Sequence, residues 1–153
     1  MKKQETNAVA SSTSSSASPF LTLHEIVQKA RQKLKHDNWE NSVGGTETET
    51  TVRRNRAALD AIAFKPRVLR DVSQIDMGTT FLGRHLRLPG WLATVGSLEL
   101  FHRDSAIAVA TAAHRFGVGH MLSSVSEVGF ESVQRQVPDA LRMFQLYVHG
   151  DAA

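Results

Sequence analysis

Between residues 90 and 148 the chain alternates between short apolar stretches and helix-like stretches, and this alternation constrains the fold more than any other feature. The apolar stretches are 90–96 (GWLATVG), 118–124 (VGHMLSS) and 141–148 (LRMFQLYV). The two stretches between them, 104–117 and 129–137, have helical character. A strand–helix–strand–helix–strand order predicts parallel pairing. Because parallel strands need helices on their faces, we expect an α/β fold, either a small doubly wound sheet or part of a barrel.

The first of these two helices carries clear start and stop signals. Asp104 and Ser105 are both suitable N-caps, and Gly117 is the kind of residue that ends a helix in a left-handed conformation. The many alanines suit close packing on a sheet. The stripe expected to face this sheet consists of Ile107, Ala110, Ala113 and Phe116.

Residues 1–20 differ from the rest of the chain in composition. They are rich in serine and threonine and lack the continuous apolar stretch of a secretory signal. We therefore predict a disordered tail, followed by one folded part over residues 21–153.

A helix is predicted for residues 23–34, where apolar side chains recur at helical spacing. Thr22 and Glu25 form a capping-box pattern at its start. Leu21 and Ile26 are spaced to form a hydrophobic staple across its first turn. This helix is expected to cover the main body.

A break at residues 36–45, which ends in two glycines, separates this helix from a second one. The second helix is predicted within residues 46–64, with Thr46 and Glu49 placed to cap it. The residues expected to face inward are Val52, Leu59 and Ile62.

Pro66 marks the end of the second helix, because proline cannot continue a helical hydrogen-bond ladder. Residues 68–88 then contain short apolar runs around Gly83, which is typical of a small hairpin. We expect this hairpin to act as a lid on the part that follows.

Composition and charge exclude several classes of protein. The 153 residues include 18 basic and 15 acidic side chains, interspersed rather than gathered, which indicates an ordinary mixed surface and no nucleic-acid partner. With 0 cysteines there is no disulfide framework and no thiolate metal site. No apolar run approaches the roughly 20 residues of a membrane span, so we expect a soluble, cytoplasmic protein.

Several longer motifs resemble one known family. Residues 41–76 (NSVGGTETETTVRRNRAALDAIAFKPRVLRDVSQID), 93–102 (ATVGSLELFH), 121–130 (MLSSVSEVGF) and 142–148 (RMFQLYV) are similar to the N-terminal half of the FMN-dependent α-hydroxy-acid oxidases and dehydrogenases. That family includes glycolate oxidase, lactate monooxygenase and mandelate dehydrogenase. The resemblance implies a (β/α)8 TIM barrel with FMN as cofactor. It further implies that this sequence contributes the cover helices, the hairpin and about three βα units.

The resemblance also implies which residues contact the flavin. Thr94, Val95 and Gly96 match the turn whose backbone lies against the flavin ring, although the family usually has proline where Thr94 stands. Ser123 matches a serine that hydrogen-bonds the flavin, and Gln145 a glutamine at the polar edge of the ring. Without the resemblance, Ser123 would be interpreted as a helix cap and Gln145 as an ordinary interior amide.

Two positions match the family's substrate-binding tyrosines. Tyr147 corresponds to a tyrosine whose hydroxyl lies beside the hydroxy acid. Asn41 stands where the family has a second tyrosine that binds the substrate carboxylate. An amide still donates a hydrogen bond but is much shorter, so we expect a changed substrate or a loss of function.

No residue of this chain is assigned a catalytic role or a metal site. The family's histidine base, its two carboxylate-binding arginines and its flavin-facing lysine have no matching motif here. His85, His102 and His114 lack the partner spacing of a base or a metal ligand, and all seven histidines are interpreted as structural or surface residues.

The resemblance implies a flavin oxidoreductase that converts an L-2-hydroxy acid, such as lactate, to the 2-oxo acid. We expect turnover only when a C-terminal half-barrel polypeptide supplies the missing groups, and none from this chain alone. The alternative is a catalytically inactive pseudoenzyme or protein-interaction fragment. The open edges of a partial barrel would then be covered by a partner or by another copy in a homo-oligomer.

Overall fold

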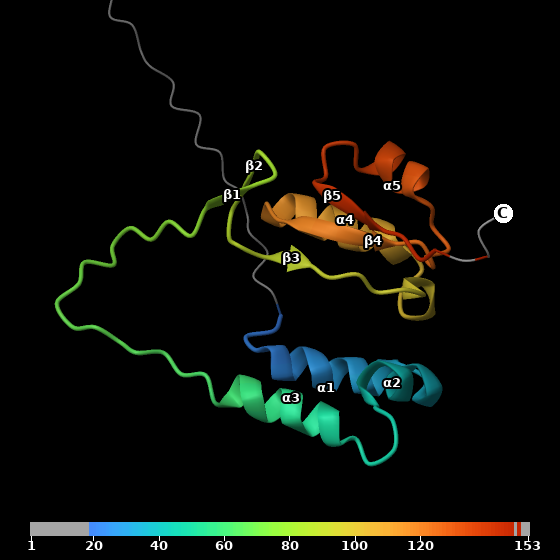
Figure 1. Cartoon of the computed structure of the whole chain (residues 1–153), viewed down its shortest axis with the longest axis horizontal. Coiled ribbons are helices and arrows are strands. Elements are labelled where there is room, and N and C mark those ends of the chain that lie inside the picture. The colour runs from blue at the N-terminus through green and yellow to red at the C-terminus, as the bar shows by residue number, and fades with distance from the viewer. Residues whose placement is uncertain (1–18, 149, 151–153) are drawn as a thin grey trace, which may run out of the picture. The chain divides into compact units, whose positions relative to one another are not determined.

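The computed structural model describes residues 19–148 and Gly150 (Figure 1). The chain divides into two compact units. One unit ends at Lys35 and the other begins at His36. The predicted tail lies outside the described residues except for its last two positions, Pro19 and Phe20.

The first unit contains α1 (Leu23–Lys33), and its start confirms the predicted cap. The hydroxyl of Thr22 accepts a hydrogen bond from the Glu25 amide at 3.3 Å. The Glu25 carboxylate in turn accepts from the Leu21 amide at 2.9 Å. The predicted staple is wrong, because the Leu21 side chain is 92% exposed and cannot pack tightly on Ile26.

A short helix occupies the segment that we predicted to be a break. α2 (His36–Val43) spans almost all of it, and the following Gly44 donates its amide to the Glu40 carbonyl at 2.8 Å. The two glycines thus end a helix. The prediction of a break is wrong for the eight residues before the glycines, which are helical.

The next helix is shorter than predicted and is not capped as predicted. α3 runs from Thr50 to Asp60, and its N-cap Glu49 has a φ of 57° and makes no side-chain cap. The Glu49 carboxylate instead accepts a hydrogen bond from the Gly45 amide at 3.1 Å, which closes the preceding turn. No residue of α3 is buried. The residues expected to face inward are exposed: Val52 by 40%, Leu59 by 61% and Ile62 by 76%.

The predicted hairpin is present, and it docks on the amino end of the parallel sheet. β1 (Thr79–Phe81) pairs antiparallel with β2 (Arg84–Leu86) around Gly83, whose φ is 71°. Phe81 meets Trp91 edge-on with ring centroids 5.5 Å apart. The Arg87 amide donates to the Gly117 carbonyl at 2.8 Å. As a lid, the hairpin therefore covers the end at which the strands begin.

The predicted strand–helix–strand–helix–strand order is confirmed. β3 (Trp91–Leu92), β4 (Gly119–Ser123) and β5 (Arg142–Gln145) form a parallel sheet in the order β3-β4-β5 (Figure 1). A 3-10 turn, η1 (Leu98–Leu100), and α4 (Ser105–Phe116) connect the first two strands, and α5 (Phe130–Gln136) connects the next two. β3 is much shorter than the predicted 90–96, because only one neighbour holds it and the chain turns at Ser97, where φ is 50°.

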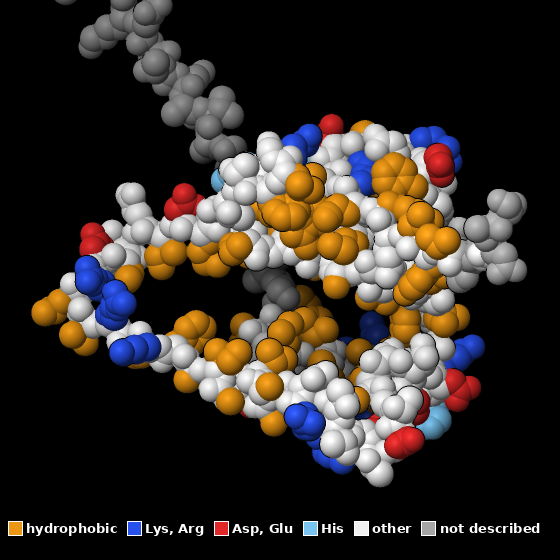
Figure 2. All heavy atoms as spheres, in the orientation of Figure 1, with side chains coloured by type: hydrophobic (Ala, Val, Ile, Leu, Met, Phe, Trp, Pro, Cys, Tyr) orange, Lys and Arg blue, Asp and Glu red, His pale blue; other side chains and the backbone are white. Residues whose placement is uncertain are grey.

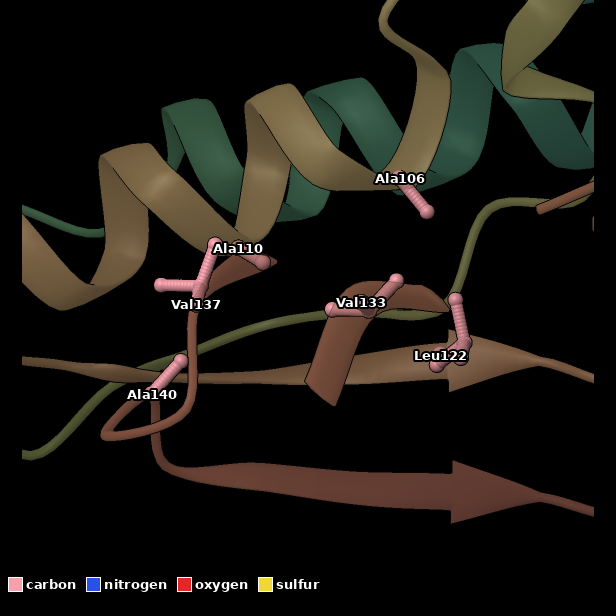
Figure 3. Close-up of a cluster of buried hydrophobic side chains, with 6 residues drawn as sticks. All are labelled: Ala106, Ala110, Leu122, Val133, Val137 and Ala140. Atoms are coloured by element: carbon pink, nitrogen blue, oxygen red, sulfur yellow. The ribbon is translucent and has the colours of Figure 1, made fainter. Parts of the chain in front are cut away.

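The core lies between α4, α5 and one face of this sheet (Figure 3). Gly117 ends α4 in the left-handed conformation, as predicted, with a φ of 85°. The predicted stripe of α4 is confirmed at Ala110 and Ala113, which are buried, and at Ile107, which packs against the core. It is wrong at Phe116, which is 47% exposed. The cluster consists of Ala106, Ala110, Leu122, Val133, Val137 and Ala140. These small side chains let the helices approach the strands closely.

Large hydrophobic side chains are exposed over the strands and along the segment between α3 and β1 (Figure 2). In that segment Phe64 and Leu69 are fully exposed, next to the basic residues Lys65 and Arg70. Within the described part of the chain, no helix has the length and apolar character needed to cross a membrane.

Candidate functional site

The carboxyl ends of β4 and β5 bring two of the predicted site residues into contact. Ser123 and Gln145 are direct partners in the parallel register. The Ser123 hydroxyl donates to the Gln145 Oε1 at 3.4 Å, and its side chain is buried. The same hydroxyl accepts from the Val125 amide at 3.2 Å. Ser123 thus orders the turn after the strand and reaches the glutamine, but it caps no helix, because the N-cap of α5 is Gly129.

Gly96 lies against the same turn, although it follows a different strand. The Ser97 amide donates to the Val125 carbonyl at 3.5 Å, which joins the end of β3 to the end of β4. A Cβ atom built on Gly96 would lie 2.7 Å from a methyl carbon of Val125 and 3.8 Å from the Ser123 Oγ. The absence of a side chain at Gly96 therefore permits this close approach.

Ser124 connects the cluster to the third strand end. Its amide donates to the Gln145 carbonyl at 3.1 Å, and its hydroxyl accepts from the Tyr147 amide at 3.2 Å. The ring of Tyr147 is about half exposed. Sequence reasoning quoted both serines of the pair but assigned a role only to Ser123. The signal for Ser124 was its place in a polar run after a buried strand.

The remaining predicted site residues are placed less centrally. Thr94 is half-buried and Val95 is exposed in the stretch that links β3 to Gly96. Asn41 is exposed on α2. The structure thus brings Gly96, Ser123, Ser124 and Gln145 together with the backbone of Tyr147, and these four residues form the strand-end cluster.

One histidine differs from the others in its surroundings. His120, on β4, is only 1% exposed, whereas His85, His102 and His114 are exposed. Burial, assisted by the positive charge of Arg142, lowers the pKa of the His120 imidazole below its usual value. Among the described residues, no group of three or more His, Cys, Asp or Glu side chains is arranged to hold a metal ion.

The strand-end cluster offers the hydroxyls of Ser123 and Ser124, the carboxamide of Gln145 and a glycine without a side chain, and Tyr147 follows two residues after β5. Such a set can donate and accept several hydrogen bonds without carrying a formal charge. In an α/β sheet, the carboxyl ends of parallel strands are where ligands bind. Polar edges of a planar heterocycle fit this donor set, because they too present both donors and acceptors.

Comparison with curated proteins places the chain among flavin enzymes. Residues 30–153 match the family described as FMN-dependent dehydrogenase. The chain is 35% identical over 134 residues to an L-lactate oxidase from Nostoc sp., covering 86% of this chain and 37% of that protein. It is 37% identical over 127 residues to glycolate oxidase 3 from Oryza sativa subsp. indica, covering 83% and 34%. The chain thus spans about a third of the length of these relatives.

Solved structures that resemble this chain also belong to α-hydroxy-acid oxidoreductases. A crystal structure of mandelate oxidase superposes with a TM-score of 0.78 at 31% identity, covering 84% of this chain and 37% of that one. A soluble mutant of the membrane-associated (S)-mandelate dehydrogenase from Pseudomonas putida gives a TM-score of 0.77 at 30% identity, covering 82% and 36%. The resemblance expected from the sequence motifs is confirmed, and the chain belongs to the FMN-dependent dehydrogenase family, whose members are α-hydroxy-acid oxidoreductases.

Proposed function

We propose that residues 21–153 form the N-terminal part of a (β/α)8 barrel that binds FMN and oxidises an L-2-hydroxy acid, such as lactate, to the 2-oxo acid. The observation that carries the proposal is the meeting of Gly96, Ser123 and Gln145 at one edge of a parallel sheet. The names of the relatives, L-lactate oxidase and glycolate oxidase, support a small hydroxy acid as substrate.

The uncovered face of the sheet supports the barrel assignment. α4 and α5 both pack on the side of the sheet to which Leu122 contributes. Strand alternation places Met121 and Ser123 on the opposite side, together with their register partners Met143 and Gln145. Parallel sheets are normally covered on both faces. Further strands and inward-pointing side chains, supplied by a C-terminal half-barrel polypeptide, would cover this side.

Different residues of the cluster would contact different parts of the cofactor. The backbone of Thr94, Val95 and Gly96 would lie against the ring. A side chain at position 96 would meet Val125, so glycine lets this turn pack against the turn after β4. The Ser123 hydroxyl and the Gln145 carboxamide would hydrogen-bond the polar edge. When bound, FMN supplies the group that accepts the hydride equivalent from the substrate. The chain's own residues orient it and exclude water from that edge.

Tyr147 and Asn41 are the proposed substrate contacts. The Tyr147 backbone is held by the Ser124 hydroxyl, which orients the residue at the carboxyl edge of the sheet. Its phenol is suited to hydrogen-bond the hydroxy acid. Asn41 takes the place of a longer side chain at the carboxylate. Losing a hydrogen bond to a charged group costs about 1.5–3 kcal/mol, so weaker substrate binding is expected.

A chimera tests the proposal directly. Residues 21–153 replace the matching segment of the Nostoc L-lactate oxidase, and bound flavin and lactate oxidation are measured. We expect a yellow, active chimera, and a loss of about twofold to tenfold in FMN affinity with Ser123→Ala or Gln145→Leu. Ser132→Ala, on α5 away from the cluster, is the matched control and should change neither quantity. A folded chimera without flavin would refute the assignment.

The departure at Asn41 favours one alternative, a catalytically inactive pseudoenzyme or protein-interaction fragment. In that case the chimera folds but stays colourless, or it binds FMN without oxidising lactate. Asn41→Tyr separates the two cases. If activity is limited only by the lost carboxylate contact, this substitution should lower the KM for lactate and leave FMN affinity unchanged.

A further inference from the structure

We propose that the cavity between β3, β4 and α4 is a second binding site, which takes a small, mainly apolar molecule carrying one hydroxyl group. Its volume is about 330 Å³. The residues that line it include Leu92, Leu98, Ala106, Val109, His120 and Leu122. Val95 and Met121 also line the cavity, which therefore borders the turn proposed to contact the flavin. Leu122 and Ser123 nevertheless point to opposite faces of β4.

His120 distinguishes this cavity from an empty space left by imperfect packing of apolar side chains. Its side chain is 1% exposed, and neither ring nitrogen has a hydrogen-bond partner among the described residues. Only its backbone amide is engaged, with the Leu141 carbonyl at 3.0 Å. A buried polar group without a partner costs free energy, so such groups are normally satisfied by water or a ligand.

The chemistry of the lining defines the class of ligand. A neutral imidazole presents one donor and one acceptor, which a hydroxyl group matches in both directions. The rest of the lining is apolar, and no lysine or arginine is among the described residues that line the cavity, so an anion is disfavoured. A cavity of about 150 Å³ already holds a benzene ring, so this one is large enough for a substituted ring or a branched alcohol.

Phenol and toluene are suitable probes, because they have nearly the same size and differ in the hydroxyl group. The 153-residue chain is titrated with each, and the methyl resonances of Ala106 and Leu122 are followed by NMR. We expect phenol to shift both resonances. His120→Leu should weaken phenol by about tenfold and strengthen toluene, whereas His120→Gln should retain phenol because its amide also donates and accepts.

Val109→Phe fills the cavity and should abolish binding of both probes, which gives a second readout if His120→Leu does not fold. Absence of any phenol-induced shift in the unsubstituted chain would overturn the proposal. So would phenol binding that is equally strong in a folded His120→Leu variant, because the imidazole would then have no part in recognition. No flavin is needed, so the result does not depend on the proposed enzymatic function.

Discussion

At the scale of single residues, the buried imidazole of His120 should make stability depend on pH. Burial lowers its folded-state pKa below the usual 6.5. At a pH between the folded-state pKa and the unfolded-state pKa of about 6.5, His120 is protonated in the unfolded chain but neutral in the folded chain. The stability of the folded chain is therefore unaffected by this group above about pH 6.5. It falls as the pH drops toward the folded-state pKa, by up to about 1.4 kcal/mol per pH unit.

The measurement is urea unfolding at pH 7.5 and pH 5.5, for the unsubstituted chain and for His120→Leu. We expect the variant to lose less stability on acidification than the unsubstituted chain. His114→Gln removes an exposed histidine of α4 and serves as the control. An identical loss in the unsubstituted chain and His120→Leu would show that His120 is solvated.

At the residue level, motifs at the strand ends singled out two side chains that the structure places side by side, and their contact with the flavin stays a prediction. Ser123 and Gln145 were assigned from such motifs, and the parallel register brings them within 3.4 Å. His120 was grouped with six other histidines, because nothing in the sequence around it distinguishes a buried position from an exposed one. Burial depends on α4 and β3 packing over it, which is a tertiary property.

At the scale of secondary-structure elements, Arg142 should fasten the end of α5 to the start of β5. Its guanidinium donates to the carbonyls of Val137 at 2.7 Å, Pro138 at 2.8 Å and Ala140 at 3.1 Å, and lies over the Phe130 ring. Lysine keeps the charge but not the planar fork. We expect Arg142→Lys to lower the free energy of unfolding by about 1–3 kcal/mol.

Urea denaturation checks this value. Arg135→Lys is a matched control on α5, because Arg135 is exposed and its guanidinium donates to the Ser132 hydroxyl at 3.0 Å rather than to backbone carbonyls. Its effect should stay within about 0.5 kcal/mol. Equal effects of the two substitutions would mean that the three carbonyl contacts do not stabilise the connection.

The elements themselves were predictable to different extents. The order of strands and helices from β3 to β5 followed from the alternation of apolar and helical stretches, and Gly117 ends α4 as expected. α2 was missed because its eight residues, HDNWENSV, carry little apolar periodicity. α3 was predicted too long, since its apolar residues suggested a buried face that the described structure leaves exposed.

At the scale of the whole molecule, buried structure is concentrated in one part of the chain. The buried core cluster lies between residues 106 and 140, whereas α1, α2 and α3 contain no buried residue. The apolar side chains of residues 61–78 are likewise exposed. In a domain of this family, such apolar surface is expected to be covered by further protein. Local stability should therefore be uneven along the chain.

Hydrogen exchange measured by mass spectrometry should reveal this unevenness. In the 153-residue chain we expect the slowest exchange in α4 and β4, and near-intrinsic exchange in α3 and residues 61–78, because their amides are not shielded by a core. In the lactate oxidase chimera, protection of residues 61–78 should rise if the added strands and helices cover them. The chain unfolded in denaturant supplies the intrinsic rates. Uniform protection in the chain alone would contradict the prediction, because it would require residues 61–78 to be packed without any partner.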